Sequence, residues 1–116
     1  FEKKDEVMSD RHFDYHTFAK MQMQHPFKTN VSPCLVPMWD NSSRRKTNAF
    51  IFTNESPEYY GEWLSHIKSN YPWSESKEKY LFINAWNEWA EGNHLEPCQK
   101  WGTQYLEKTK QVLENE

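Results

Sequence analysis

The densest cluster of polar side chains occupies residues 84–97, at the end of an apolar run. The segment reads Asn-Ala-Trp-Asn-Glu-Trp-Ala-Glu-Gly-Asn-His-Leu-Glu-Pro and holds three carboxylates, three amides, two indoles and a histidine. A glutamate beside indole rings is costly to desolvate without partners, so ordinary packing explains this composition poorly. In parallel α/β folds, ligands bind and catalysis occurs at the carboxyl ends of strands. The segment is therefore the first candidate for a functional site.

The spacing of Glu88 and Glu91 suits paired acid/base chemistry if the backbone bends between them. On a continuing strand the two would face opposite sides, about 10 Å apart along the chain. A turn after Asn87 would instead place their Cβ atoms about 5–6 Å apart. That approaches the ~5–5.5 Å separation of the carboxylates in retaining glycosidases. Gly92 supplies backbone freedom for such a bend, but spacing alone leaves open that both acids are simply exposed in a loop.

A second candidate group follows an earlier apolar run. Trp39 could serve as a stacking platform for a sugar ring, and Asp40 could hydrogen-bond sugar hydroxyls. The alternative for Asp40 is that it caps backbone amides of its own loop. Arg44 and Arg45 could hold an anionic sugar or a phosphate bidentately, and a solvated or ion-paired role is equally open.

The elements that must position these residues alternate between helix and strand. Ser56 as N-cap, Pro57 at the first helical position and Glu58 in the first turn make one helix start unambiguous. Periodicity predicts helix, strand, helix, strand, helix at residues 14–24, 30–38, 56–70, 80–86 and 103–113, with a short extended piece at 49–52. The second strand is a largely apolar run without charges and is expected to be buried on both faces. This order is typical of a parallel α/β unit, and two strands cannot close a barrel.

Composition favours part of a larger architecture and excludes several function classes. Only 36% of the 116 residues are hydrophobic, below the ~45–50% usual for globular domains. The chain begins at Phe1, so we expect a piece of a longer protein with residues 1–13 as a polar, flexible lead-in. A net charge of −3 with scattered basic residues gives no reason to expect a nucleic-acid partner. No stretch approaches the ~18 apolar residues of a membrane span.

Metal binding and disulfide bonding are also disfavoured. His12 and His16 stand four residues apart but have no convincing third ligand, so no zinc site is expected. Cys34 and Cys98 are isolated. In a reducing cytoplasm both would be free thiols, and a disulfide would form only if the fold brought them together.

Two motifs resemble those of WbsX-type proteins. Residues 84–92, with Leu95-Glu96-Pro97 and then Gly102 and Tyr105-Leu106-Glu107, are similar to the closing motif of that family. Residues 37–45, which read Pro-Met-Trp-Asp-Asn-Ser-Ser-Arg-Arg, are similar to its Trp-Asp-Asn loop with an arginine pair. The resemblance covers about residues 14–114. WbsX-type proteins are assigned to polysaccharide and lipopolysaccharide biosynthesis and are related to the mannosidases and mannanases of glycoside hydrolase family 99, which are TIM barrels.

The resemblance implies a fold, a reaction and residue roles. Residues 14–116 would form the C-terminal βαβα part of a (β/α)₈ barrel, in an enzyme that makes or cleaves glycosidic bonds. Glu88 would match the base that acts on the sugar 2-hydroxyl, and Glu91 the general acid/base. The remaining expected substrate contacts are Trp39, Asp40, Arg44, Trp86, Asn87, Trp89 and His94. The hydrolases commonly have histidine where this chain has Ala90, which agrees better with the WbsX branch.

This chemistry requires no metal or organic cofactor. The expected partner is a glycan or sugar, and the expected location is the bacterial cytoplasm. Two alternatives remain open at this stage. One is a non-catalytic glycan-binding module that uses the same aromatic residues. The other is an incomplete barrel without activity of its own, which associates with itself or docks onto the missing part.

Overall fold

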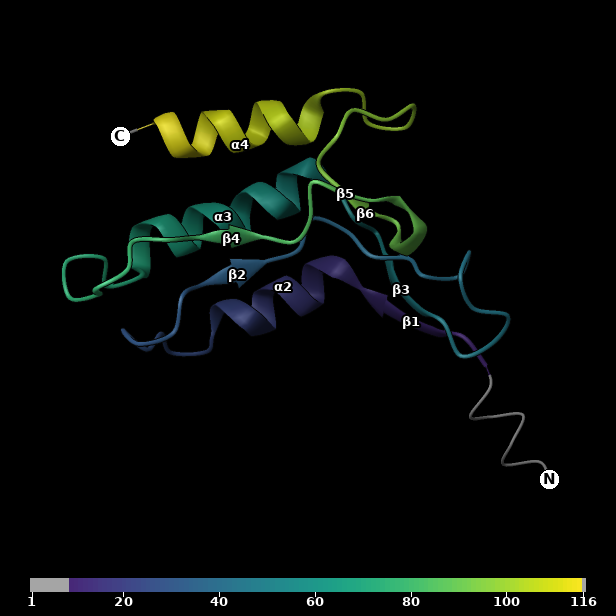
Figure 1. Ribbon diagram of the computed structural model, residues 1–116, viewed down its shortest axis with the longest axis horizontal. Coiled ribbons are helices and arrows are strands. Elements are labelled where there is room, and N and C mark those ends of the chain that lie inside the picture. The colour runs from purple at the N-terminus through teal and green to yellow at the C-terminus, as the bar shows by residue number, and fades with distance from the viewer. Residues whose placement is uncertain (1–8, 116) are drawn as a thin grey trace.

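The computed structural model describes residues 9–115 of the chain (Figure 1). The helices are α2 (Tyr15–Met23), α3 (Pro57–Asn70) and α4 (Gln104–Glu114). The strands are β1 (Arg11–Asp14), β2 (Cys34–Leu35), β3 (Phe50–Thr53), β4 (Phe82–Ile83), β5 (Asn87–Glu88) and β6 (Asn93–His94), and a 3₁₀ turn, η1 (Trp89–Glu91), separates the last two. The fold class is mixed α/β, as predicted.

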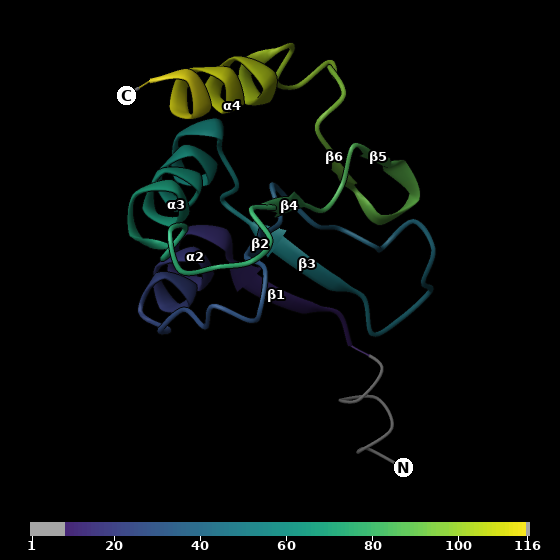
Figure 2. The ribbon, with the colours of Figure 1, turned by 60° about the vertical axis from the view of Figure 1, so that its left-hand side comes forward.

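The strands form three short pairs on one side of the helices. β1 pairs with β3 and β2 pairs with β4, both in parallel, whereas β5 and β6 form an antiparallel hairpin. The helices gather on one side of the molecule, and the β5–β6 hairpin lies on the other (Figure 2). Because β2 and β4 run in parallel, the segments that follow them leave from the same end of the pair.

Local capping explains where α2 and α3 begin. The Asp14 carboxylate accepts hydrogen bonds from the Thr17 amide at 2.8 Å and the Thr17 hydroxyl at 2.9 Å, and from the Asn54 side chain at 3.0 Å. These bonds lower the pKa of Asp14, the Thr17 amide contributing most. Ser56 caps α3 through the Tyr59 amide, as the sequence predicts.

The core lies between the helices and the parallel strands and is rich in aromatic residues. Its fully buried side chains include Tyr15, Leu35, Tyr60, Leu64 and Ile67. Burying one such aliphatic side chain stabilises the fold by about 1.5–3 kcal/mol. Burial also raises the pKa of Tyr60 to about 12, and its hydroxyl forms a 2.7 Å hydrogen bond with that of Thr109 on α4.

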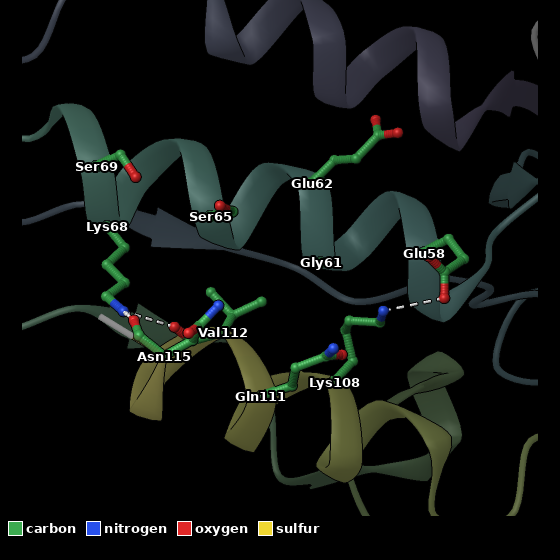
Figure 3. Close-up of a pocket in the computed structure, with 10 residues that line it drawn as sticks. All are labelled: Glu58, Gly61, Glu62, Ser65, Lys68, Ser69, Lys108, Gln111, Val112 and Asn115. Carbon is green, nitrogen blue, oxygen red and sulfur yellow. Dashed lines mark hydrogen bonds and ion pairs between the residues drawn. The ribbon is translucent and has the colours of Figure 1, made fainter.

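Helix α4 is held against α3 by polar contacts along one groove (Figure 3). Lys108 forms a 3.0 Å ion pair with Glu58, and its aliphatic stem lies where a side chain at Gly61 would stand. Lys68 donates to the carbonyl oxygen of Val112 at 2.8 Å and also to that of Asn115 at the end of α4. The groove encloses about 360 Å³, and both of its lysines have partners.

The strands differ most from the sequence-based expectations. The expected strand 30–38 is reduced to β2, because Pro33 and Pro37 flank it and lack the N–H that a ladder needs. The expected strand 80–86 is reduced to β4 and is not buried on both faces. Tyr80, Phe82 and Trp86 are 59%, 54% and 51% exposed, since β4 pairs only with β2 within residues 9–115.

The first structured element also begins earlier than expected. Residues 11–14 form strand β1, where a polar lead-in through residue 13 was predicted. No apolar pattern marks this strand, because its side chains are largely exposed and its backbone pairs with β3. Phe13 stacks on Phe50 across the pair, with ring centroids 4.6 Å apart. Residues 1–8 of the predicted lead-in lie outside the described part of the chain.

Candidate active site

Two polar segments that are distant in the sequence adjoin in the structure. Residues 39–45 follow β2 and residues 86–96 follow β4. The Asp40 amide donates to the Glu91 carbonyl oxygen at 2.9 Å, and the Ser43 hydroxyl donates to the Ala90 carbonyl oxygen at 2.8 Å. Arg44 adds a 3.1 Å ion pair to the Glu91 carboxylate. The carboxyl ends of the two parallel strands therefore lead into one polar site.

Gly92 makes the close approach of the two segments possible. Its backbone is left-handed, with φ 55° and ψ 35°. A Cβ atom at this position would lie 2.7 Å from the Asp40 carbonyl oxygen and 2.9 Å from the Asp40 Cβ. Glycine is therefore required both by the backbone conformation and by the space available.

The loop that begins at Asp40 is fixed by its own hydrogen bonds. Asp40 Oδ1 accepts from the Ser42 amide at 2.9 Å and the Ser42 hydroxyl at 2.5 Å. Asn41 Oδ1 accepts from the Phe50 amide at 2.8 Å, and the Asn41 carbonyl oxygen accepts from the Arg44 amide at 3.1 Å. Asp40 thus caps its own loop, which was one of the two roles considered for it. Trp39 is partly buried and packs against the core.

The β5–β6 hairpin presents an aromatic surface on a polar support. The Trp89 ring stacks on His94 at 3.7 Å between centroids, and its Nε1 donates to the Glu96 carboxylate at 2.6 Å. His94 is buried, and its Nδ1 lies 3.1 Å from the Glu96 carbonyl oxygen. The structure therefore brings His94 to Trp89 and to the loop backbone. Trp89 is 48% exposed despite these contacts.

The two candidate carboxylates stand in different surroundings. Glu88 pairs with Asn93 through the backbone of the hairpin, and its exposed side chain has no hydrogen-bond or ion-pair partner within residues 9–115. The Glu91 side chain is 25% exposed and pairs with Arg44, whose side chain is 56% exposed. Ion pairs this exposed contribute about 0.2–1 kcal/mol. Gly92 and the backbone hydrogen bonds therefore hold the two segments together more than the ion pair does.

A hollow of about 300 Å³ lies beside Glu91. It is lined by Asn41, Arg44, Arg45 and Glu91, so two guanidinium groups face one carboxylate. Asn87 and Trp86 are exposed on the neighbouring hairpin. The hollow thus has two positive charges against one negative charge, and the segment that carries Glu91 also carries exposed indole rings.

Comparison with known proteins assigns the chain to a family. The family model described as glycosyltransferase WbsX matches residues 1–109.

The chain belongs to the WbsX glycosyltransferase family.

The chain is also similar to two curated bacterial proteins. It is 39% identical over 106 residues to the uncharacterized protein WxcX of Xanthomonas campestris pv. campestris strain B100. It is 38% identical over 105 residues to the protein of the same name from strain ATCC 33913. These matches cover 87% and 86% of the chain but 15% of each relative, so the chain spans a small part of their length. No solved structure matches.

The described part of the chain offers no evident metal or disulfide site. Within residues 9–115, no group of three or more histidine, cysteine, aspartate or glutamate side chains could hold a metal ion. Cys34 and Cys98 are both free, and partial burial raises the pKa of the Cys34 thiol. In the same residues, no helix has the length and apolar character needed to cross a bilayer.

Sequence reasoning missed three residues that shape the site. Ser43 joins the two segments, Asn41 lines the hollow, and Asn93 is a fully buried residue of β6. Asn93 Oδ1 accepts from the Ala85 amide at 3.2 Å, which fixes the chain just before the candidate carboxylates. The sequence indicates a role for these three residues only weakly, because Asn and Ser are common in any loop. Only the neighbouring Gly92 suggests a close backbone approach.

Proposed function

We propose that this chain carries the active-site end of an enzyme that makes or cleaves glycosidic bonds in bacterial polysaccharide or lipopolysaccharide metabolism. The observation that carries the proposal is the meeting of two loops after parallel strands, one bearing Asp40 and Arg44, the other Glu88 and Glu91. Membership of a glycosyltransferase family supports a carbohydrate-active role. The parallel β2–β4 pair, covered by helices on one side, fits the last βα units of a (β/α)₈ barrel.

Glu88 and Glu91 would divide the proton transfers of a retaining reaction. Glu88 accepts the proton of the sugar 2-hydroxyl, whose oxygen attacks the anomeric carbon and forms a 1,2-anhydro ring. The bond to the departing oxygen breaks as Glu91 protonates that oxygen. Glu91 then takes the proton of water or an acceptor hydroxyl, which opens the ring, and Glu88 returns its proton to the 2-oxygen. This division follows the family motif. Glu88 is open to an incoming sugar, and Glu91 is partly enclosed beside Arg44.

The other expected residues would bind the sugar. Trp86 and Trp89 offer exposed indole faces for stacking, with Trp89 held in place by His94 and Glu96. Asn87 and Asp40 would hydrogen-bond hydroxyl groups, with Trp39 at the edge of the site, and Arg44 would contact the substrate while pairing with Glu91. No metal or organic cofactor enters this chemistry.

Replacing each carboxylate by its amide tests the proposal in the full protein that contains this chain. We expect Glu88→Gln and Glu91→Gln each to lower transfer or hydrolysis of labelled glycans by about 10²–10⁴-fold. Glu107→Gln is the matched control, because Glu107 is exposed on α4 away from the site. Activity that persists in both site variants would overturn the assignment of the pair.

A non-catalytic glycan-binding module is the second candidate, favoured by the fixed and half-exposed ring of Trp89. In that case the wild-type protein would bind oligosaccharides without turning them over. Glu88→Gln and Glu91→Gln would then retain binding, whereas Trp89→Ala would lose it. The two candidates thus differ in turnover: the enzyme turns the glycan over and loses this activity in the two glutamate variants, whereas the binding module shows no turnover to lose.

The chain would work in association with further structure. β2 and β4 pair only with each other within residues 9–115, and apolar side chains beside them are exposed, so we propose docking onto the rest of the barrel or onto a second copy. A bacterial cytoplasmic location fits the two free cysteines.

A further inference from the structure

The hollow beside Glu91 has cationic donors that no residue of the described chain uses. Arg44 gives one terminal nitrogen, Nη1, to Glu91, while its Nε and Nη2 have no partner within residues 9–115. The Arg45 side chain makes one long contact, from Nε to the Thr47 carbonyl oxygen at 3.4 Å. Two guanidinium groups thus face the hollow with most of their N–H groups unpaired.

Two larger hollows within residues 9–115 do not share this property. In the α3–α4 groove, Lys108 is paired with Glu58, and Lys68 caps the end of α4 (Figure 3). The hollow between residues 29–32 and 75–78 carries Glu75 and Glu78 against a single lysine. The hollow beside Glu91 is therefore the one among these with cationic donors to spare.

The loop that presents the arginines is already in place. Its turns are closed by the hydrogen bonds of Asp40 and Asn41, and Ser43 ties it to Ala90. A ligand would therefore order little more than the two arginine side chains, which limits the entropic cost of binding. Because the exposed pair with Glu91 is weak, Arg44 can turn toward an anion at small cost.

We propose that Arg44 and Arg45 bind an oxyanion attached to the sugar substrate, namely a phosphate or a carboxylate. This inference rests on the proposed glycan function and adds the substrate class, a negatively charged glycoside. Planar guanidinium groups match two oxygens of either anion bidentately. Asn41, whose Oδ1 is held by the Phe50 amide, contributes its side-chain N–H groups at the wall of the hollow.

Calorimetric titration of the full protein with four probes tests this inference. The probes are inorganic phosphate, mannose 1-phosphate, methyl glucuronide and the neutral methyl mannoside. We expect one or both charged glycosides to bind at least about tenfold more tightly than methyl mannoside. The ratio of mannose 1-phosphate to methyl glucuronide affinity distinguishes a phosphate-linked donor from an acidic sugar.

Variants in the same loop separate a built site from diffuse charge. Arg45→Gln leaves the Arg44–Glu91 pair intact and should weaken binding of the charged glycoside about tenfold, without affecting methyl mannoside. Lys46→Gln is the matched control. This substitution removes the same charge from the same loop, but Lys46 does not line the hollow. The inference would be overturned if both variants lost the same affinity for the charged glycoside. It would also be overturned if the wild-type protein bound charged and neutral glycosides equally tightly. If neutral glycosides still bind and react, that failure leaves the proposed function standing.

Discussion

At the scale of single residues, Gly92 decides whether the two loops of the site can meet. An alanine there would adopt a left-handed backbone, at a cost of about 1–2 kcal/mol. Its Cβ would also press on the backbone of Asp40 at 2.7 Å, and overpacking of this kind costs about 1–3 kcal/mol more. We predict that Gly92→Ala lowers the free energy of unfolding by the sum of both effects, as measured by urea denaturation.

Gly102→Ala is the matched control for this prediction. Gly102 has almost the same backbone angle, φ 56°, but a Cβ atom there would have no neighbour within 4 Å. Its substitution should therefore show the conformational cost alone. If both variants lose the same stability, the contact between Gly92 and Asp40 does not hold the loops together.

The residue types of the site could be predicted from the sequence, but their pairing could not. Glu88, Glu91, Asp40 and Arg44 all stand out by composition at the ends of apolar runs. The ion pair between Arg44 and Glu91 joins residues 47 positions apart. No local rule predicts such a contact, because it depends on the parallel register of β2 and β4. The roles of these residues in catalysis and binding stay predictions.

At the scale of elements, Asp14 couples the start of α2 to the end of β3. Its carboxylate accepts two hydrogen bonds from Thr17 and one from Asn54, which lower its pKa below the ordinary 3.8. A lowered pKa means that the folded state binds the proton less tightly than the unfolded state does. The stabilisation is therefore present above about pH 4 and is lost as the pH falls through the lowered pKa.

We predict that Asp14→Asn makes the stability of the fold less dependent on pH in the acid range. Asparagine still caps a helix but does not titrate. The urea midpoint of the wild-type chain should then fall more steeply than that of the variant as the pH drops below about 4. Ser56→Ala serves as the control, because it removes a neutral cap and should cost about 1 kcal/mol at every pH. An Asp14 carboxyl that titrates at its ordinary value by NMR would contradict the prediction.

The helices follow from local sequence and the strands do not. α3 begins at Pro57 behind its Ser56 cap and ends at Asn70, as predicted, because capping and periodicity are properties of neighbouring residues. β1 pairs through its backbone and carries exposed side chains, so its sequence has no alternation of apolar and polar residues that would predict a strand. The apolar composition of residues 80–86 predicts that the segment is buried. It does not predict which part of the structure would cover it.

At the scale of the whole molecule, exposed aromatic side chains lie beside an open pair of strands. Tyr80 and Phe82 are more than half exposed, and their rings contact each other at 6.2 Å between centroids. Two-stranded sheets are marginal in water unless another layer or strand covers them. Exposed apolar side chains next to an unpaired edge favour association with another chain.

We predict that the isolated chain self-associates through this surface. Its sedimentation coefficient should rise with protein concentration over about a hundredfold range. Phe82→Ser should reduce the association, because it removes an exposed ring from β4 beside the open edge. Met21→Ser is the matched control, since Met21 is 56% exposed on α2, away from β4. The prediction is wrong if the chain stays monomeric at every concentration. It is also wrong if both substitutions change the association equally, because the association would then not depend on this surface.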